Sequence, residues 1–379
     1  MSLNDAWFSI SGEPAKKVQS IHDLPNDTIF LTNLTYTQFH AAGLTRHANF
    51  RNEGWLRSGV HQLASELGLT IDYASQSVAA SAIAAIAQRV INIAHEKIGV
   101  TPTVLHSFNK DVADAIGPAK SLIQSQFYKS FEQCASQTWV SVVNNHNYTG
   151  RNPSFTARVN RLSHAKALLN TKLPPDTGWE FQKSSSKIKL DSWLSTIDKP
   201  FLAHCIIKNV QPMVGELFSW GSGAKAQRDW LTNIELDQLR EYADIEIDSV
   251  LICSNDPITP AQASLLPSSP LDELSISLGI FAELLWTSLT SKQPQTSDGR
   301  FSAAAAWLRA ADRMIMFNFA QRAAARGLDV AGYGTGAVTI RYPEGALKKS
   351  LSVATDIGLI PPASKFIEAR QLEGAEGFG

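Results

Sequence analysis

Hydrophobic residues recur every three to five positions in several long stretches of the chain, which is the spacing of one face of an α-helix. The clearest stretch runs from Ser75 to Gly99; it begins at a serine that can cap a helix and ends at a glycine. Asp111 to Ala135 and the alanine-rich Ser302 to Arg326 show the same spacing, as do 155–170 and 271–289. The pattern therefore predicts a mainly α-helical protein.

Segments without helical spacing divide these helices into two lobes. A single hydrophobic core stops growing at about 250–300 residues, so a chain of 379 residues has room for two. Turn-forming residues interrupt the first 45 positions, polar residues make 172–200 a predicted loop, and glycines at 221 and 223 predict a hinge. We expect an N-terminal arm at 1–45, an N-lobe at 46–220, a C-lobe at 221–365 and a C-terminal tail at 366–379.

Composition places the chain among ordinary globular proteins, with 44% hydrophobic and 18% charged residues. The longest apolar run, Leu278 to Leu289, is shorter than the roughly 20 residues that a membrane span requires. The N-terminus lacks the basic and apolar regions of a secretory signal, so we expect an intracellular protein without a membrane partner. Cys134, Cys205 and Cys253 lie far apart and are predicted to be core residues.

Charge is sorted along the sequence. Residues 151–228 hold twelve Lys or Arg and five Asp or Glu, although the whole chain has a formal net charge of −1. Residues 229–248 then hold seven acidic residues and one basic one, so the two blocks can pair with each other. A basic stretch in a neutral protein is also the electrostatic footprint of a polyanion site, which favours nucleic-acid binding.

Lysine and arginine side chains bind phosphates without reading base sequence, and aromatic rings can stack on bases. The predicted RNA-binding residues are Arg158, Arg161, Lys183, Lys187, Lys189, Lys225 and Arg228, with Arg322, Arg326 and Arg341 from the second lobe. The aromatic residues near the basic segment are Phe155, Trp179, Phe181, Trp193 and Trp220.

Catalytic chemistry has one candidate, the alternating carboxylates Asp244, Glu246 and Asp248. On a strand they would share one face, as a two-metal nucleotidyl-transfer site requires, whereas on a helix they would belong to a solvated face. We favour the helix, because no further acidic motif completes a metal cage. Glycines at 332, 334 and 336 precede a strand-like segment and predict a tight turn rather than a phosphate-binding loop. No catalytic residue, metal or cofactor is therefore assigned.

One segment resembles a known family. Tyr333-Gly334-Thr335-Gly336-Ala337-Val338-Thr339-Ile340-Arg341-Tyr342 is followed by Ala346-Leu347 and a predicted helix that ends at Gly358-Leu359. This layout is similar to a C-lobe segment of rhabdovirus nucleoproteins, and the chain resembles the two-lobed nucleoproteins of non-segmented negative-strand RNA viruses, including mymonaviruses. The resemblance implies that two helical lobes hold single-stranded RNA in a basic groove, and that terminal arms join copies into a filament.

The sequence thus predicts a nucleoprotein that encapsidates viral RNA without sequence preference. Its expected partners are single-stranded RNA, further copies of the chain and a viral polymerase, in the host cytoplasm and the virion. Two alternatives remain open. One is a capsid or scaffold protein that assembles without nucleic acid, and the other is a metal-dependent nuclease or nucleotidyl-transfer enzyme that uses Asp244, Glu246 and Asp248.

Overall fold

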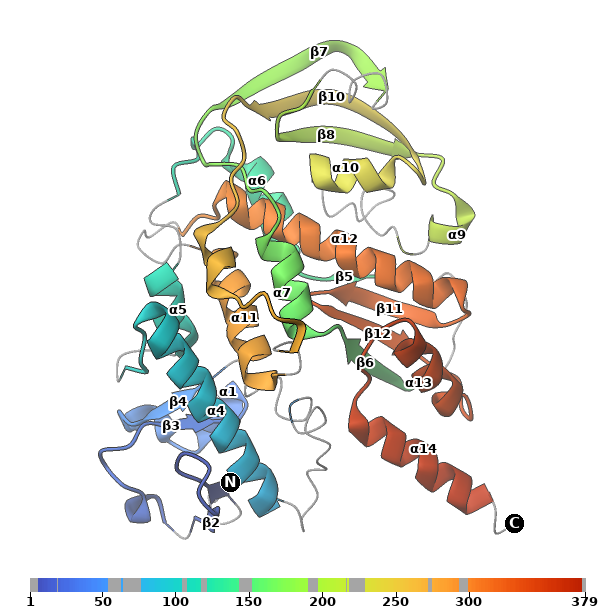
Figure 1. The fold of residues 1–379 in the computed structure, drawn as a ribbon. Coiled ribbons are helices and arrows are strands. Elements are labelled where there is room, and N and C mark those ends of the chain that lie inside the picture. Colours follow the sequence, from blue (N-terminus) through green and yellow to red (C-terminus); the bar gives the residue numbers. More distant parts are fainter. Residues whose placement is uncertain are drawn as a thin grey trace. The chain divides into compact units, whose positions relative to one another are not determined.

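The structure, a computed structural model, shows a mixed α/β fold (Figure 1). It describes residues 6–18, 20–53, 63, 76–103, 108–116, 121–142, 152–189, 197–215, 217, 229–271, 275–292 and 299–376. These residues form twelve strands in four sheets as well as the helices, so the prediction of a mainly α-helical protein is wrong.

Two compact units divide the chain, and neither is continuous in sequence. Unit 1 comprises Met1–Gly117, Pro267–Ser288 and Pro362–Gly379, and unit 2 comprises Pro118–Leu266 and Leu289–Pro361. This division differs from the boundaries expected after residues 45, 220 and 365.

Unit 1 contains two small sheets and a set of helices. An antiparallel pair joins β1 (Trp7–Phe8) to β2 (Lys16–Lys17), and a parallel pair joins β3 (Phe30–Thr32) to β4 (Phe50–Asn52). The helical elements are η2 (Ile21–Asp23), α1 (Tyr36–Ala41), η3 (Leu44–Arg46), α4 (Gln76–Ile98), α5 (Phe108–Ile116), α14 (Ala363–Glu376) and all but the last residue of α11 (Ile276–Leu289).

The segment predicted as an extended N-terminal arm is folded. Val18, Leu24, Phe30, Phe39, Leu44 and Phe50 form one buried cluster. The rings of Phe30 and Phe50 stack at 5.4 Å between centroids, which ties β3 to β4. Burial of six large apolar side chains explains why this turn-rich sequence folds, because hydrophobic area removed from water is the main favourable contribution to folding.

Unit 2 contains two four-stranded antiparallel sheets. The β7 sheet has the order β7 (Trp179–Lys189), β10 (Asp244–Cys253), β8 (Phe201–Lys208), β9 (Trp230–Thr232). The β11 sheet has the order β5 (Val140–Ser141), β11 (Asp329–Gly334), β12 (Ala337–Arg341), β6 (Ser154–Arg158). The helical elements are α6 (Tyr128–Ser136), α7 (Arg161–Leu169), α9 (Pro212–Gly215), α10 (Asn233–Leu239), η4 (Ala261–Leu265), α12 (Ala303–Ala325) and α13 (Leu347–Asp356).

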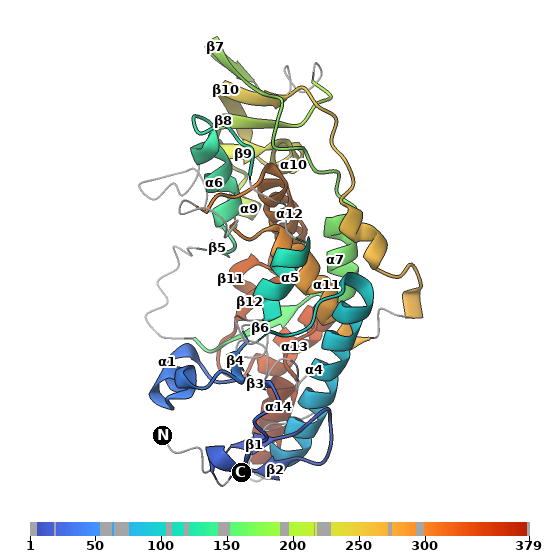
Figure 2. The same ribbon diagram turned by 90° about the vertical axis from the view of Figure 1, so that its left-hand side faces the viewer.

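Helix α12 lies between the two sheets of unit 2 (Figures 1 and 2). It contacts β11 and β12 on one side and α6, α10 and β9 on the other. Fourteen of its residues are buried, many of them alanines, which allow the neighbouring elements to approach closely. The prediction of a helix from Ser302 to Arg326 is confirmed, and the Ser302 side chain accepts a hydrogen bond from the Ala305 N–H as the N-cap.

Other predicted elements differ from the structure. The helix predicted at 155–170 is strand β6 followed by helix α7, because the Asn160 side chain caps α7 at the Ser163 N–H while β6 pairs with β12. The helix predicted at 111–135 is two helices, α5 and α6, and the polar loop predicted at 172–200 contains the eleven-residue strand β7. Helix α4 matches the prediction for Ser75 to Gly99.

Among the described residues, helix α4 has the length and apolar composition that a membrane-spanning helix needs. Core helices of water-soluble proteins can have the same composition, so this observation alone assigns no membrane location. The expectation of no membrane partner stays a prediction.

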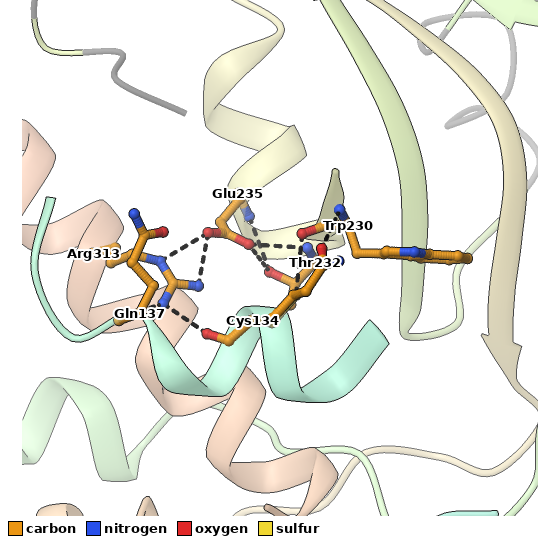
Figure 3. A network of polar contacts seen from close by, with 7 residues as sticks. Cys134, Gln137, Trp230, Thr232, Glu235 and Arg313 are labelled. Carbon is orange, nitrogen blue, oxygen red and sulfur yellow. Dashed lines mark hydrogen bonds and ion pairs between the residues drawn. The ribbon is translucent and has the colours of Figure 1, made fainter. Parts of the chain in front are cut away.

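A buried ion pair joins α12 to α10 (Figure 3). The guanidinium group of Arg313 donates to Glu235 Oε1 through Nε at 3.0 Å and Nη2 at 2.9 Å, and both side chains are fully buried. Arg313 Nη1 also donates to the carbonyl oxygens of Cys134 and Gln137, each at 2.8 Å. The second oxygen of Glu235 accepts the N–H and hydroxyl of Thr232, which caps α10.

Asp312, the preceding residue of α12, fixes the other sheet. It accepts the backbone N–H groups of Thr335 at 2.7 Å and Gly336 at 3.0 Å, in the turn between β11 and β12. Its carboxylate also lies 3.0 Å from Nε2 of the buried His164 on α7. Gly336 has φ +68°, and an added Cβ would lie 3.2 Å from the His164 ring. The predicted tight turn is confirmed, with Asp312 as its anchor.

Replacing Glu235 by alanine should destabilise unit 2 strongly. The change leaves the buried Arg313 charge without its partner, which typically costs about 3–5 kcal/mol. Urea unfolding at neutral pH measures the loss. Lys292→Ala is the control, because it breaks the exposed pair with Glu132 and should cost less than about 1 kcal/mol. Equal losses in the two variants would contradict the role of the buried pair.

Candidate nucleic-acid interface

The β7 sheet presents a row of side chains on one face. In the antiparallel ladder Leu251 lies opposite Phe181 on β7 and Leu202 on β8. Residues directly opposite each other point to the same face, and so do residues two positions along a strand. Lys183 therefore shares the face of Phe181.

An open hollow of about 700 Å³ lies on this face. We call it the aromatic hollow; its described lining residues are Gln126, Phe127, Ser130, Glu180, Phe181, Trp230 and Leu251. Phe181 stands on edge strand β7 and is 51% exposed, and Trp230 stands on the opposite edge strand β9. Three strand spacings of about 4.8 Å separate the two edges, so the hollow spans roughly 14 Å of the sheet.

Helix α6 forms the wall of the aromatic hollow and is fixed to β9. Gln133 Oε1 accepts the backbone N–H of Asp229 at 3.1 Å, and Cys134 Sγ contacts the Trp230 carbonyl at 3.2 Å. The ring of Phe131 packs edge-on against Trp179 at 4.8 Å. These contacts hold Phe127 and Trp230 in place around the hollow, so the site rests on a packed scaffold.

A cluster of polar side chains from β7, β8 and β10 lies beside the hollow. His204 Nδ1 lies 2.7 Å from Asp248 Oδ1, and its ring contacts Trp230 at 5.5 Å between centroids. Burial opposes ionisation of Asp248, but hydrogen bonds from His204 and Ser249 and the charges of His204 and Lys183 outweigh it and lower the Asp248 pKa. Lys183 is exposed and lies opposite Ser249, so it supplies a positive charge next to the aromatic rings.

The alternating carboxylates do stand on a strand, so the preference for a solvated helix face is wrong. A bulge between Ile247 and Ser249 interrupts the regular pairing of β10. Each carboxylate is bound by a residue on or just after β8: Asp244 by Asn209 at 2.7 Å, Glu246 by Lys208 at 2.9 Å and Asp248 by His204 at 2.7 Å. Within the described residues no group of three or more His, Cys, Asp or Glu could hold a metal ion.

Among the predicted RNA-binding residues that the structure describes, those of the basic middle segment divide between the two sheets of unit 2. Arg158 ends β6 and Arg161 begins α7, and both belong to the region of the β11 sheet. Lys183, Lys187 and Lys189 stand on β7, in the other sheet. Lys225 and Arg228 lie outside the described residues, as do Trp193 and Trp220.

The three cations expected from the second lobe have separate locations. Arg341 forms a two-pronged ion pair with Asp329, Nε to Oδ2 and Nη2 to Oδ1, each at 3.0 Å, so its charge is balanced within the β11–β12 hairpin. Arg322 lies over the Phe319 ring at 4.2 Å, and Arg326 is the exposed C-cap of α12. None of these observations tests phosphate binding, which stays a prediction for each residue.

Aromatic residues expected to stack on bases divide in the same way. Phe155 and Trp179 are buried, at 3% and 5% exposure, and belong to the core. Phe181 is exposed in the aromatic hollow. Sequence reasoning missed Phe127, Trp230 and His204, because each comes near the hollow only through strand pairing or helix packing. The alternating apolar residues of 244–253 were the available signal for a strand here.

Comparisons with known proteins give no family. No family model matches the sequence, and no curated protein matches it. Solved structures of Phi29 DNA polymerase do match, with a TM-score of 0.41. The complex with primer-template DNA and incoming nucleotides is 12% identical, over 76% of this chain and 61% of the polymerase. The complex with single-stranded DNA is 14% identical, over 76% and 60%.

The chain thus spans about three fifths of the length of these polymerases. A similarity at this TM-score and identity establishes neither a shared fold nor a shared activity. The resemblance to viral nucleoproteins is nevertheless wrong, because it implied a mainly helical fold and the described residues form four β-sheets as well as helices. The segment on which it rested, Tyr333 to Leu359, is the β11–β12 hairpin followed by α13.

Ionisation of Asp248 should make the free energy of unfolding depend on pH between about pH 3 and 5. The Asp248 pKa is lowered below the ordinary 3.8, so its ionised form stabilises the folded state above about pH 4, and this contribution is lost as the pH falls through the folded-state pKa. Because the side chain is 37% exposed, solvent screening keeps the effect below about 1 kcal/mol. Urea unfolding between pH 3 and 5 should show a shallower decline for Asp248→Asn than for the unmodified protein. Identical declines would contradict the His204–Asp248 interaction.

Proposed function

We propose that this protein binds single-stranded nucleic acid on the β7 sheet, with bases in the aromatic hollow and a phosphate at Lys183. The observation that carries the proposal is the open hollow itself, where the half-exposed ring of Phe181 stands with Phe127 and Trp230 beside an exposed lysine. Proteins that bind single strands without sequence preference combine aromatic stacking platforms with positive charge along the backbone path.

Single strands fit this site better than a duplex. Stacking on a protein ring needs a base whose face is free, and bases within a duplex are already stacked on their neighbours. A ring stacks on any base and a lysine binds phosphate without reading a base edge, which supports binding without sequence preference. The preference for RNA and the assembly of copies into a filament have no support in the site and stay predictions.

Two substitutions separate the base and phosphate contributions. Phe181→Ala should weaken binding of a labelled single strand by about 5- to 150-fold, the value of one stacked base, without changing its salt dependence. Lys183→Ala should flatten the slope of log affinity against log salt concentration by about 0.7, the value for one phosphate on a single strand. Fluorescence anisotropy with RNA and DNA oligonucleotides of unrelated sequence measures both effects.

Matched controls are available in other parts of the chain. Phe366 is 39% exposed on α14, and Lys349 is exposed on α13, so Phe366→Ala and Lys349→Ala remove similar groups that do not line the hollow. Both variants should keep the affinity and the salt dependence of the unmodified protein. The proposal fails if Phe181→Ala binds as tightly as Phe366→Ala, or if affinity changes strongly with base sequence.

A further inference from the structure

The structure assigns a second binding site to unit 1, a cavity of about 560 Å³ between the N-terminal strands and α4. We propose that it binds a neutral molecule with an aliphatic chain. Its size falls within the range of about 300–1,000 Å³ that small-molecule pockets have. The site lies in a different unit from the aromatic hollow and is independent of the proposed nucleic-acid binding.

The lining of this cavity excludes charged ligands. Trp7, Phe8, Ile29 and Leu31 line one side, and none of the described lining residues is Asp, Glu, Lys, Arg or His. A carboxylate or phosphate placed there would lose its hydration without gaining an ion-pair partner, which is strongly unfavourable. A neutral apolar molecule pays no such penalty and gains from leaving water.

Several polar groups at the lining already have partners. Trp7 Nε1 donates to Gln76 Oε1 at 3.1 Å, and Ser11 Oγ donates to Gln88 Oε1 at 3.2 Å. The side-chain oxygen of Gln38 accepts the N–H and hydroxyl of Thr35 in the capping box of α1. The buried Thr32 Oγ1 also belongs to a lining residue and has no hydrogen-bond partner among the described residues, so a neutral aliphatic ligand with one hydroxyl group would match the polar groups of the cavity.

Helix α4 supplies the opposite wall. Its cavity-lining apolar residues succeed one another at helical steps: Ala79, Ala80, Ile83, Ala84, Ala87 and Ile91. Only 22% of the apolar 18-residue stretch of α4 is buried inside the protein. A bound aliphatic chain would remove part of this apolar face from water, which gives the unusual composition of α4 a physical role.

The walls are held at a fixed separation. Gly12, in the turn between β1 and β2, has φ +90°, and a Cβ at this position would lie 2.7 Å from the Cβ of Ala85 on α4. The turn therefore rests directly on α4. On the other side Phe30 and Phe50 belong to the buried cluster of the N-terminal segment. The cavity is thus bounded by packed elements and is largely formed before a ligand enters.

Competition between a neutral and a charged ligand of equal chain length tests, on the unmodified protein, whether the cavity excludes charged ligands. Nile red, a neutral fluorescent dye, is bound first and then displaced with 1-dodecanol or with dodecanoate at pH 8. Dodecanol should displace the dye at a concentration at least tenfold lower than dodecanoate. Equal displacement by the two, or no binding of the dye, would overturn the proposal.

A cavity-filling substitution tests the location. Ala84→Phe places a ring in the cavity and should reduce dodecanol affinity at least tenfold, whereas Val78→Phe, at a 56% exposed position of the same helix, should not change it. Ala84→Leu is a milder version in case the phenylalanine variant does not fold, which circular dichroism would reveal. Binding to neutral phosphatidylcholine vesicles, unchanged by Ala84→Phe and without dodecanol binding, would indicate a membrane surface instead and overturn the cavity site.

Discussion

The ion pair between Arg313 and Glu235 is the interaction on which the arrangement of unit 2 depends. A buried guanidinium group is tolerated only when its partner and its remaining donors are satisfied, and here the donors reach Glu235 and two carbonyls at the end of α6. These bonds fix α6, α10 and β9 on α12. Phe127 lies at the start of α6 and Trp230 lies on β9. The positions of these two rings in the aromatic hollow therefore depend on the buried Arg313 of α12.

Asp312 and Arg313 together explain why an alanine-rich helix carries two adjacent charges in its buried section. Adjacent helical residues point about 100° apart, so the two side chains reach different neighbours. Asp312 holds the β11–β12 turn and His164, and Arg313 holds the other side of unit 2. The alanines bring these elements close, and the two charges fix their register. A helix with alanine alone would pack closely without specifying which neighbour it meets.

The sequence predicted correctly those elements whose conformation is determined by neighbouring residues in the chain. Helices α4 and α12 and the turn after β11 carry their own capping or glycine signals, and the sequence predicted each of them. Strands β6 and β7 were missed because pairing partners far along the chain decide their conformation. The serines of β7 resemble a loop, yet the strand pairs with β10 over most of its length. Trp179 and Phe181 point to the same face of β7, and Trp179 is buried because its ring packs against Phe131 on α6 and Trp307 on α12.

The distribution of charge along the sequence was also misleading, because residues far apart in the chain pair with each other in the fold. The basic and acidic blocks meet across strands: Lys208 contacts Glu246, and His204 contacts Asp248. The separation of basic and acidic residues along the sequence is thus partly explained by ion pairs between β8 and β10. Pairing between the two blocks was the alternative that the sequence had left open. The case for nucleic acid consequently moves from the number of cations to one surface, where Lys183 shares a face of the β7 sheet with the exposed ring of Phe181 and the partly buried ring of Trp230.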